Sequence, residues 1–138
     1  MFRYNKTVTV FNQYTSDDDV LGSEHWFPTV LEGVLLKETQ GANITRTGLM
    51  DANSVTMHIK TEGYEKPYMD PVEWGLLLDK TDAFTLCRER DFFVVGDVSD
   101  VEVRDNFFAY MKENYDGVYR IMTVDKYETI PHYEIGGK

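Results

Sequence analysis

Apolar and polar residues alternate, at the two-residue spacing of a β-strand, in short runs along most of the chain. In residues 7–11 the side chains of Val8 and Val10 share one face, and residues 54–59 alternate in the same way. Further β-forming runs occupy residues 29–37, 84–87, 92–95, 118–124 and 130–135. Residues 92–95 are apolar throughout, which predicts a central strand. Gly33 interrupts its run and predicts a β-bulge or a close backbone approach.

One segment has helical spacing instead. Ser99 and Glu102 have the spacing of a capping box, and apolar residues such as Phe107 and Tyr110 follow at helical intervals. Gly117 is placed to stop the helix. The pattern predicts one short helix near residues 101–115. A second, single helical turn is expected at residues 71–74, because Pro suits the first position of a helix.

Many short strands with a single helix predict a mainly β (β-rich α+β) fold. We expect a small antiparallel β-barrel or sandwich. No βαβ repetition, internal repeat or low-complexity tract divides the sequence. Residues 1–138 are therefore predicted to form a single β-rich domain.

The net charge and the composition of the chain argue against several classes of function. The formal net charge of −10 argues against proteins that hold nucleic acid through phosphate contacts, and against binding to an anionic membrane. A single cysteine, Cys87, and a polar start predict a protein made in the cytoplasm. No apolar run approaches the length of a membrane span.

Catalytic and metal-binding patterns are weak. The three histidines, His25, His58 and His132, are far apart, and His58 is expected on the surface of its strand. Arg88 and Arg90 beside Cys87 offer positive charge that can lower a thiol pKa. Asp91, Asp97 and Asp100 lie around residues 92–95 but have no His or Lys partner at short range, and Gly96-Asp97 has the character of a turn. We expect no enzyme, no cofactor and no metal.

The candidate interaction residues lie in two polar loops and near the two ends of the chain, where aromatic residues occur. Two polar loops, residues 16–22 and 41–48, are candidates for docking or for lining a channel. Aromatic side chains near both ends of the chain are candidates for an interface. The named candidates are Asp17, Asp18 and Asp19 in the first loop, Asn43 and Arg46 in the second, and Phe2, Tyr4 and Tyr133 near the ends.

Five segments carry a resemblance to known proteins: residues 6–12 (KTVTVFN), 26–30 (WFPTV), 91–96 (DFFVVG), 116–121 (DGVYRI) and 132–138 (HYEIGGK). Together they resemble a largely uncharacterised family of structural-module proteins from phages and prophages of Gram-positive bacteria. The layout is also similar to that of the head-closure, or stopper, proteins of long-tailed phages. The turn at residues 71–74 and the helix near 99–115 have no sure counterpart in those proteins.

The resemblance implies a non-enzymatic virion protein, a neck or head–tail connector subunit made in the host cytoplasm. Its expected partners are further copies in a ring, joined by β-edge and aromatic contacts, and the phage portal or adaptor and tail proteins. DNA would pass without tight binding, because an acidic wall repels the duplex. Stopper, adaptor and tail-terminator roles all stay open.

An alternative function follows from the acidity. The 24 Asp and Glu residues permit a phage accessory protein that inhibits a host nucleic-acid-binding factor by presenting carboxylates in place of phosphates.

Overall fold

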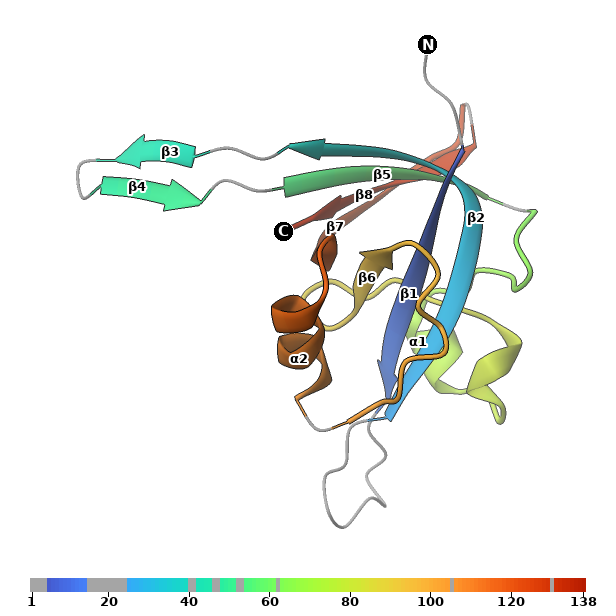
Figure 1. Ribbon diagram of the computed structural model, residues 1–138. Coiled ribbons are helices and arrows are strands. Elements are labelled where there is room, and N and C mark those ends of the chain that lie inside the picture. The colour runs from blue at the N-terminus through green and yellow to red at the C-terminus, as the bar shows by residue number, and fades with distance from the viewer. Residues whose placement is uncertain are drawn as a thin grey trace.

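The computed structural model describes residues 5–14, 25–39, 42–45, 48–51, 54–61, 63–104, 106–129 and 131–138. Six strands close into an antiparallel barrel in the order β1-β2-β5-β8-β7-β6, and β6 pairs with β1 to complete it (Figure 1). The strands are β1 (Lys6–Tyr14), β2 (His25–Thr39), β5 (Ser54–Lys60), β6 (Phe92–Val95), β7 (Val118–Tyr127) and β8 (His132–Gly137). The predicted mainly β fold is confirmed, in its barrel form.

A bend in β2 lets the barrel close. The first part of β2 pairs with β1 and its last residues, from Leu35 onward, pair with β5. Between Lys6 and Thr7 the register with β1 shifts, so that Gly33 has no partner, and Gly33 has a φ of 82°. A bulge of this kind bends a strand and increases its twist. The bulge predicted at Gly33 is therefore confirmed, and it redirects β2 from one neighbour to the other.

Two apolar clusters lie on the two faces of the same sheet. Val8 and Val10 point into the barrel, where they pack with residues such as Met57 and Ile135. Phe11 points outward from β1. The outer cluster comprises Phe11, Trp26, Phe92, Val94, Phe107, Met111 and Val118. Because β6 contributes to both clusters, it is buried on both faces, as its apolar sequence predicts.

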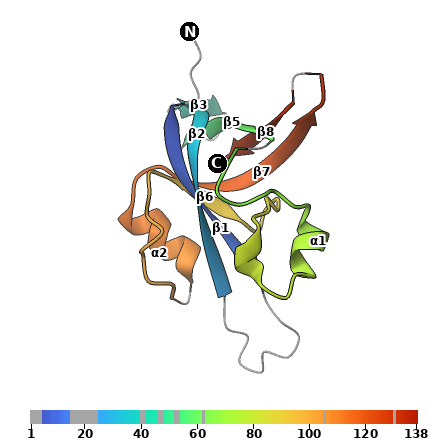
Figure 2. The ribbon, with the colours of Figure 1, turned by 90° about the vertical axis from the view of Figure 1, so that its right-hand side faces the viewer.

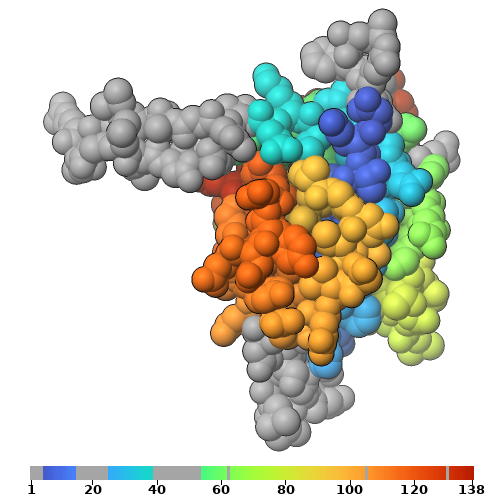
Figure 3. All heavy atoms as spheres, in the orientation of Figure 1, coloured from blue at the N-terminus to red at the C-terminus, as the bar shows by residue number. Residues whose placement is uncertain are grey.

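The outer cluster is covered by α2 (Phe107–Asn114), and the chain from β6 through α2 forms one side of the molecule (Figure 3). This helix begins later than residues 99–101, so the predicted start is wrong. The Asp97 carboxylate accepts hydrogen bonds from the Ser99 amide and hydroxyl, at 3.2 and 2.8 Å, which holds Ser99 in a turn. Asn106, just before the helix, has a φ of 54°. Gly117, at φ 71°, leads the chain into β7.

The segment between β5 and β6 crosses one side of the barrel. It contains α1 (Pro71–Gly75), which confirms the predicted helical turn, and the 3-10 helix η1 (Lys80–Asp82). The predicted strand at residues 84–87 is wrong, since Phe84 makes only an isolated bridge with Tyr68. Thr85 bonds instead to the side chain of Asn12, so side-chain contacts hold this segment in place of a strand ladder.

Candidate functional site

Three aliphatic side chains in and just after α1 are exposed to solvent. Trp74 is fully buried, and its indole N–H donates to the carbonyl oxygen of Ala83 at 3.1 Å. Val72, Leu76 and Leu78 are 78%, 79% and 106% exposed. We call these three residues the aliphatic surface. Helix α1, which contains Val72, lies on the side of the barrel opposite α2 (Figure 2). Exposed aliphatic residues that occur together mark contact surfaces.

A hairpin extends beyond the barrel. Strands β3 (Ala42–Thr45) and β4 (Gly48–Asp51) pair with each other and, within the described residues, with no barrel strand. They follow the last pair of β2 with β5, Thr39 with Ser54, and project away from the barrel (Figure 1). We call residues 42–51 the hairpin arm. Each strand of the arm has one edge without a partner strand among the described residues, and such an edge can pair with another chain.

An open groove of about 420 Å³ lies beside α1. Asp70 and Lys126 form an ion pair there, and the Tyr68 hydroxyl donates to the same carboxylate at 3.3 Å. Burial, and then the charge of Asp70, raises the pKa of Tyr68, so its phenol is protonated at neutral pH. The remaining lining residues are Pro71, Leu86, Cys87, Arg88, Glu89 and Val124.

The environment of Cys87 differs from the one suggested by its neighbours in the sequence. Burial raises the pKa of this thiol, and the positive charges of Arg90 and Arg88 do not offset that effect. Both arginines lower the pKa of the thiol, as their charge predicts, but burial outweighs them. A thiol with a raised pKa is a poor nucleophile at neutral pH.

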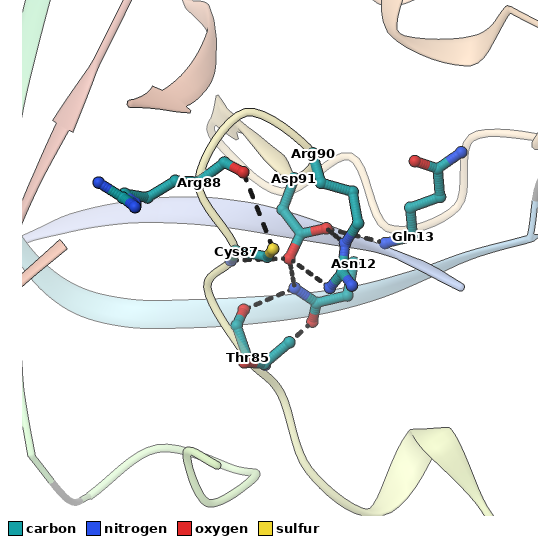
Figure 4. A network of polar contacts seen from close by, with 7 residues as sticks. All are labelled: Asn12, Gln13, Thr85, Cys87, Arg88, Arg90 and Asp91. Carbon is teal, nitrogen blue, oxygen red and sulfur yellow. Dashed lines mark hydrogen bonds and ion pairs between the residues drawn. The ribbon is translucent and has the colours of Figure 1, made fainter. Parts of the chain in front are cut away.

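A buried carboxylate, Asp91, connects this segment to β1 (Figure 4). It accepts hydrogen bonds from the backbone amides of Gln13 and Cys87, each at 3.0 Å, and from the Asn12 side chain at 2.9 Å. Arg90 forms an ion pair with it, with its Nε 2.8 Å from the nearer carboxylate oxygen. With its donors supplied by the protein, Asp91 acts as a structural anchor rather than as an acid or base.

The barrel brings together two histidines that are far apart in the sequence. His58 on β5 pairs with Glu134 on β8, and His132 lies two residues before Glu134 on the same strand. One ligand atom from each of the three side chains lies within 4.8 Å of the others. Sequence patterns did not reveal this set. The one part of it that the sequence could have indicated is the pair His132 and Glu134, whose two-residue spacing in a strand puts both side chains on one face.

The candidate interaction residues are placed only in part. Tyr133 on β8 is half-buried, and its ring lies 4.7 Å from that of Tyr68. Asn43 lies in β3, with its side chain outside the described parts of the structure. The remaining candidates, Phe2, Tyr4, Asp17, Asp18, Asp19 and Arg46, lie outside the described residues.

Comparison with known protein families places the chain in a family. Within the described part of the chain, no helix is long and apolar enough to cross a membrane. No curated protein matches the chain. The model of DUF6751, described as a family of unknown function, matches residues 3–138. The match covers nearly the whole sequence, and the protein therefore belongs to the DUF6751 family.

Proposed function

We propose that the protein is a non-enzymatic structural subunit of a phage particle, a head-closure component of the neck that assembles as a ring between head and tail. The observation that carries the proposal is the hairpin arm, which leaves a closed barrel and pairs with none of its strands in the described structure. The resemblance of five sequence segments to phage structural modules supplies the phage context.

The arm has a physical reason to bind a partner. A two-stranded hairpin alone is at best marginally stable in water, whereas a third strand makes such a sheet stable. The closed barrel has all six of its strands paired on both sides over at least part of their length. The β-edge contact expected from the sequence is therefore assigned to the arm, which can add to a sheet of a neighbouring subunit.

The aliphatic surface supplies a second contact on a different part of the molecule. When one surface of a subunit binds a different surface of the next, repetition produces a ring if the rotation closes. The arm and the aliphatic surface are two such different surfaces. A ring built in this way uses both of them in every subunit, and burying Val72, Leu76 and Leu78 adds a hydrophobic contribution to assembly.

The net charge of −10 fits a channel through which DNA slides. We expect the triple substitution of Asp17, Asp18 and Asp19 by lysine to hinder DNA passage, since phosphates would then bind the loop. The measurement is phage titre beside the thermal unfolding of the purified variant. An unchanged titre with an intact fold would remove this loop from the channel.

The arm is tested by deleting it. Residues 40–53 are replaced by Asn-Gly, a two-residue hairpin turn that can join Thr39 to Ser54, which are already paired. A matched control replaces the same residues with a flexible Gly-Ser linker of equal length. Because the barrel contacts are kept, both variants should unfold at temperatures close to that of the intact protein.

The readouts are complementation of a phage that lacks the protein and incorporation into purified particles. Both variants should fail in both assays, because each removes the paired strands. Normal incorporation of the Asn-Gly variant would contradict the role of the arm. If the Asn-Gly variant fails but the Gly-Ser variant is incorporated normally, assembly depends on the length of this segment rather than on its strand pairing.

A further inference from the structure

Strand register places three metal-binding side chains on the outer face of the barrel. Ile59 on β5 and Ile135 on β8 are fully buried, so the adjacent residues His58 and Glu134 point outward. His132 shares the outward face with Glu134. The rings of His58 and His132 stack with centroids 5.4 Å apart and planes inclined by 19°. All three side chains are half-buried, which limits the positions that they can adopt.

Strand β7 supports this set from the other side. Tyr127 pairs with His132 across the strands, and its ring stacks on the imidazole at 4.7 Å with an inclination of 5°. Asp125 lies directly opposite Glu134 and brings a second carboxylate to the same region. The region therefore has negative charge, which favours a cation.

The ligand types favour a transition metal. Zinc binds imidazole nitrogen and carboxylate oxygen at about 2.0–2.2 Å, which places tetrahedral ligand atoms about 3.4 Å apart. The three ligand atoms now lie within 4.8 Å of one another, so metal binding requires side-chain rotation that brings them closer and turns the two imidazoles out of their stack. Magnesium prefers oxygen ligands and retains its water, so two imidazoles select against it.

We propose that His58, His132 and Glu134 form a binding site for a divalent transition-metal ion, for which Zn²⁺ is the best-fitting probe. Water or a group from another molecule completes the coordination. The bound ion links β5 to β8, two adjacent strands of the barrel. Because an ion that binds the folded state alone shifts the equilibrium toward it, the metal stabilises the barrel. This site is independent of the proposed role in a phage neck.

The test uses the full-length protein without a histidine tag, titrated with ZnCl₂ and separately with MgCl₂ by isothermal calorimetry. We expect about one zinc ion per chain. His58→Ala, His132→Ala and Glu134→Gln should each weaken zinc binding by about tenfold or more, because loss of a group that merely orients a metal ligand already costs about 10–100-fold. His25→Ala is the matched control, because His25 begins β2 roughly 30 Å along the strand from Leu35, the partner of His58.

Thermal unfolding provides a second readout. Zinc should raise the unfolding temperature of the intact protein and of His25→Ala, and should raise that of the three ligand variants clearly less at the same zinc concentration. Circular dichroism without metal shows whether each variant is folded, and His58→Gln replaces His58→Ala if the latter is not. The proposal is overturned if the ligand variants bind zinc as tightly as the intact protein. The proposal would also be overturned if His25→Ala lost as much zinc affinity as the ligand variants, or if the intact protein bound magnesium as tightly as zinc.

Discussion

Replacing Asp91 with asparagine should destabilise the barrel strongly, although the two side chains have nearly the same shape. Asp91 is fully buried. One carboxylate oxygen accepts from the Gln13 amide and from Arg90 Nε, and the other from Asn12, Cys87 and Arg90 Nη2. An amide group has one acceptor oxygen and one NH₂. Whichever way it is oriented, two or more donors then face another donor.

The size of the effect follows from the less costly orientation. With the NH₂ toward Gln13, one backbone amide loses its acceptor, and leaving a buried donor unsatisfied costs about 1–3 kcal/mol. Arg90 is 32% exposed, so water compensates much of the lost ion pair, and we assign it about 1 kcal/mol or less. The expected loss is about 1–4 kcal/mol. Asp91→Ala, which removes both acceptors, should cost about 3–5 kcal/mol.

The assay is urea unfolding at neutral pH, with the m-value used to confirm a two-state transition. The expected loss is a large part of a typical domain's stability of about 5–15 kcal/mol, so Asp91→Asn should still fold. Asp97→Asn is the control, since Asp97 is exposed and bonds only within its own turn. A loss below about 1 kcal/mol for Asp91→Asn would refute the assigned role of the carboxylate.

Three further predictions concern single side chains. Since burial raises its pKa, Cys87 should react with iodoacetamide more slowly than a free cysteine at neutral pH, and equal rates would contradict this environment. A Cβ at Gly137 would lie 2.8 Å from Cγ1 of Val55, so Gly137→Ala should lose about 1–3 kcal/mol in urea unfolding, whereas Gly75→Ala, with open space around it, should not. Burial, and then the Glu38 carboxylate, raise the pKa of Tyr119 from its ordinary value of 10.0 to about 12, so its contribution to stability is full below pH 10 and falls between pH 10 and 12. Between pH 10 and 12, the free energy of unfolding should fall less steeply for Tyr119→Phe than for the intact protein. An identical fall in the two proteins would contradict the prediction.

Local patterns were sufficient to predict most of the strands. Alternation at Val8 and Val10 identified the inward face of β1, and the continuous apolar run identified β6 as a strand covered on both sides. Gly33 identified the bulge. Each of these features depends on neighbours in the sequence and on the two-residue period of a strand, which is why the sequence alone reveals them.

Two predictions were wrong for different reasons. The capping-box spacing at Ser99 predicted a helix start, but the Asp97 carboxylate, two residues earlier, holds Ser99 in a turn. The apolar run at residues 84–87 did not become a sheet strand, because Asn12 and Asp91 satisfy its backbone groups. Asn12 lies far away in the sequence, so the run itself does not reveal that contact.

The convergence of His58 with His132 is a consequence of register. It requires β5 to lie beside β8 with His58 opposite Glu134, and nothing in either segment specifies that pairing. A shift of one residue would turn one set of side chains to the other face. The sequence predicted His58 on a strand surface. Only the fold shows that His132 and Glu134 lie beside it, where the three side chains can bind a metal ion.

The most direct test of the proposed function is electron microscopy of particles from a phage or prophage that lacks this protein. A head-closure subunit seals the filled head and provides the surface to which the tail binds. We predict heads that leak DNA, together with unattached tails, and rescue by the intact protein but not by the arm-deleted variant. Normal, infectious particles without the protein would contradict the structural role and would favour the host-directed alternative.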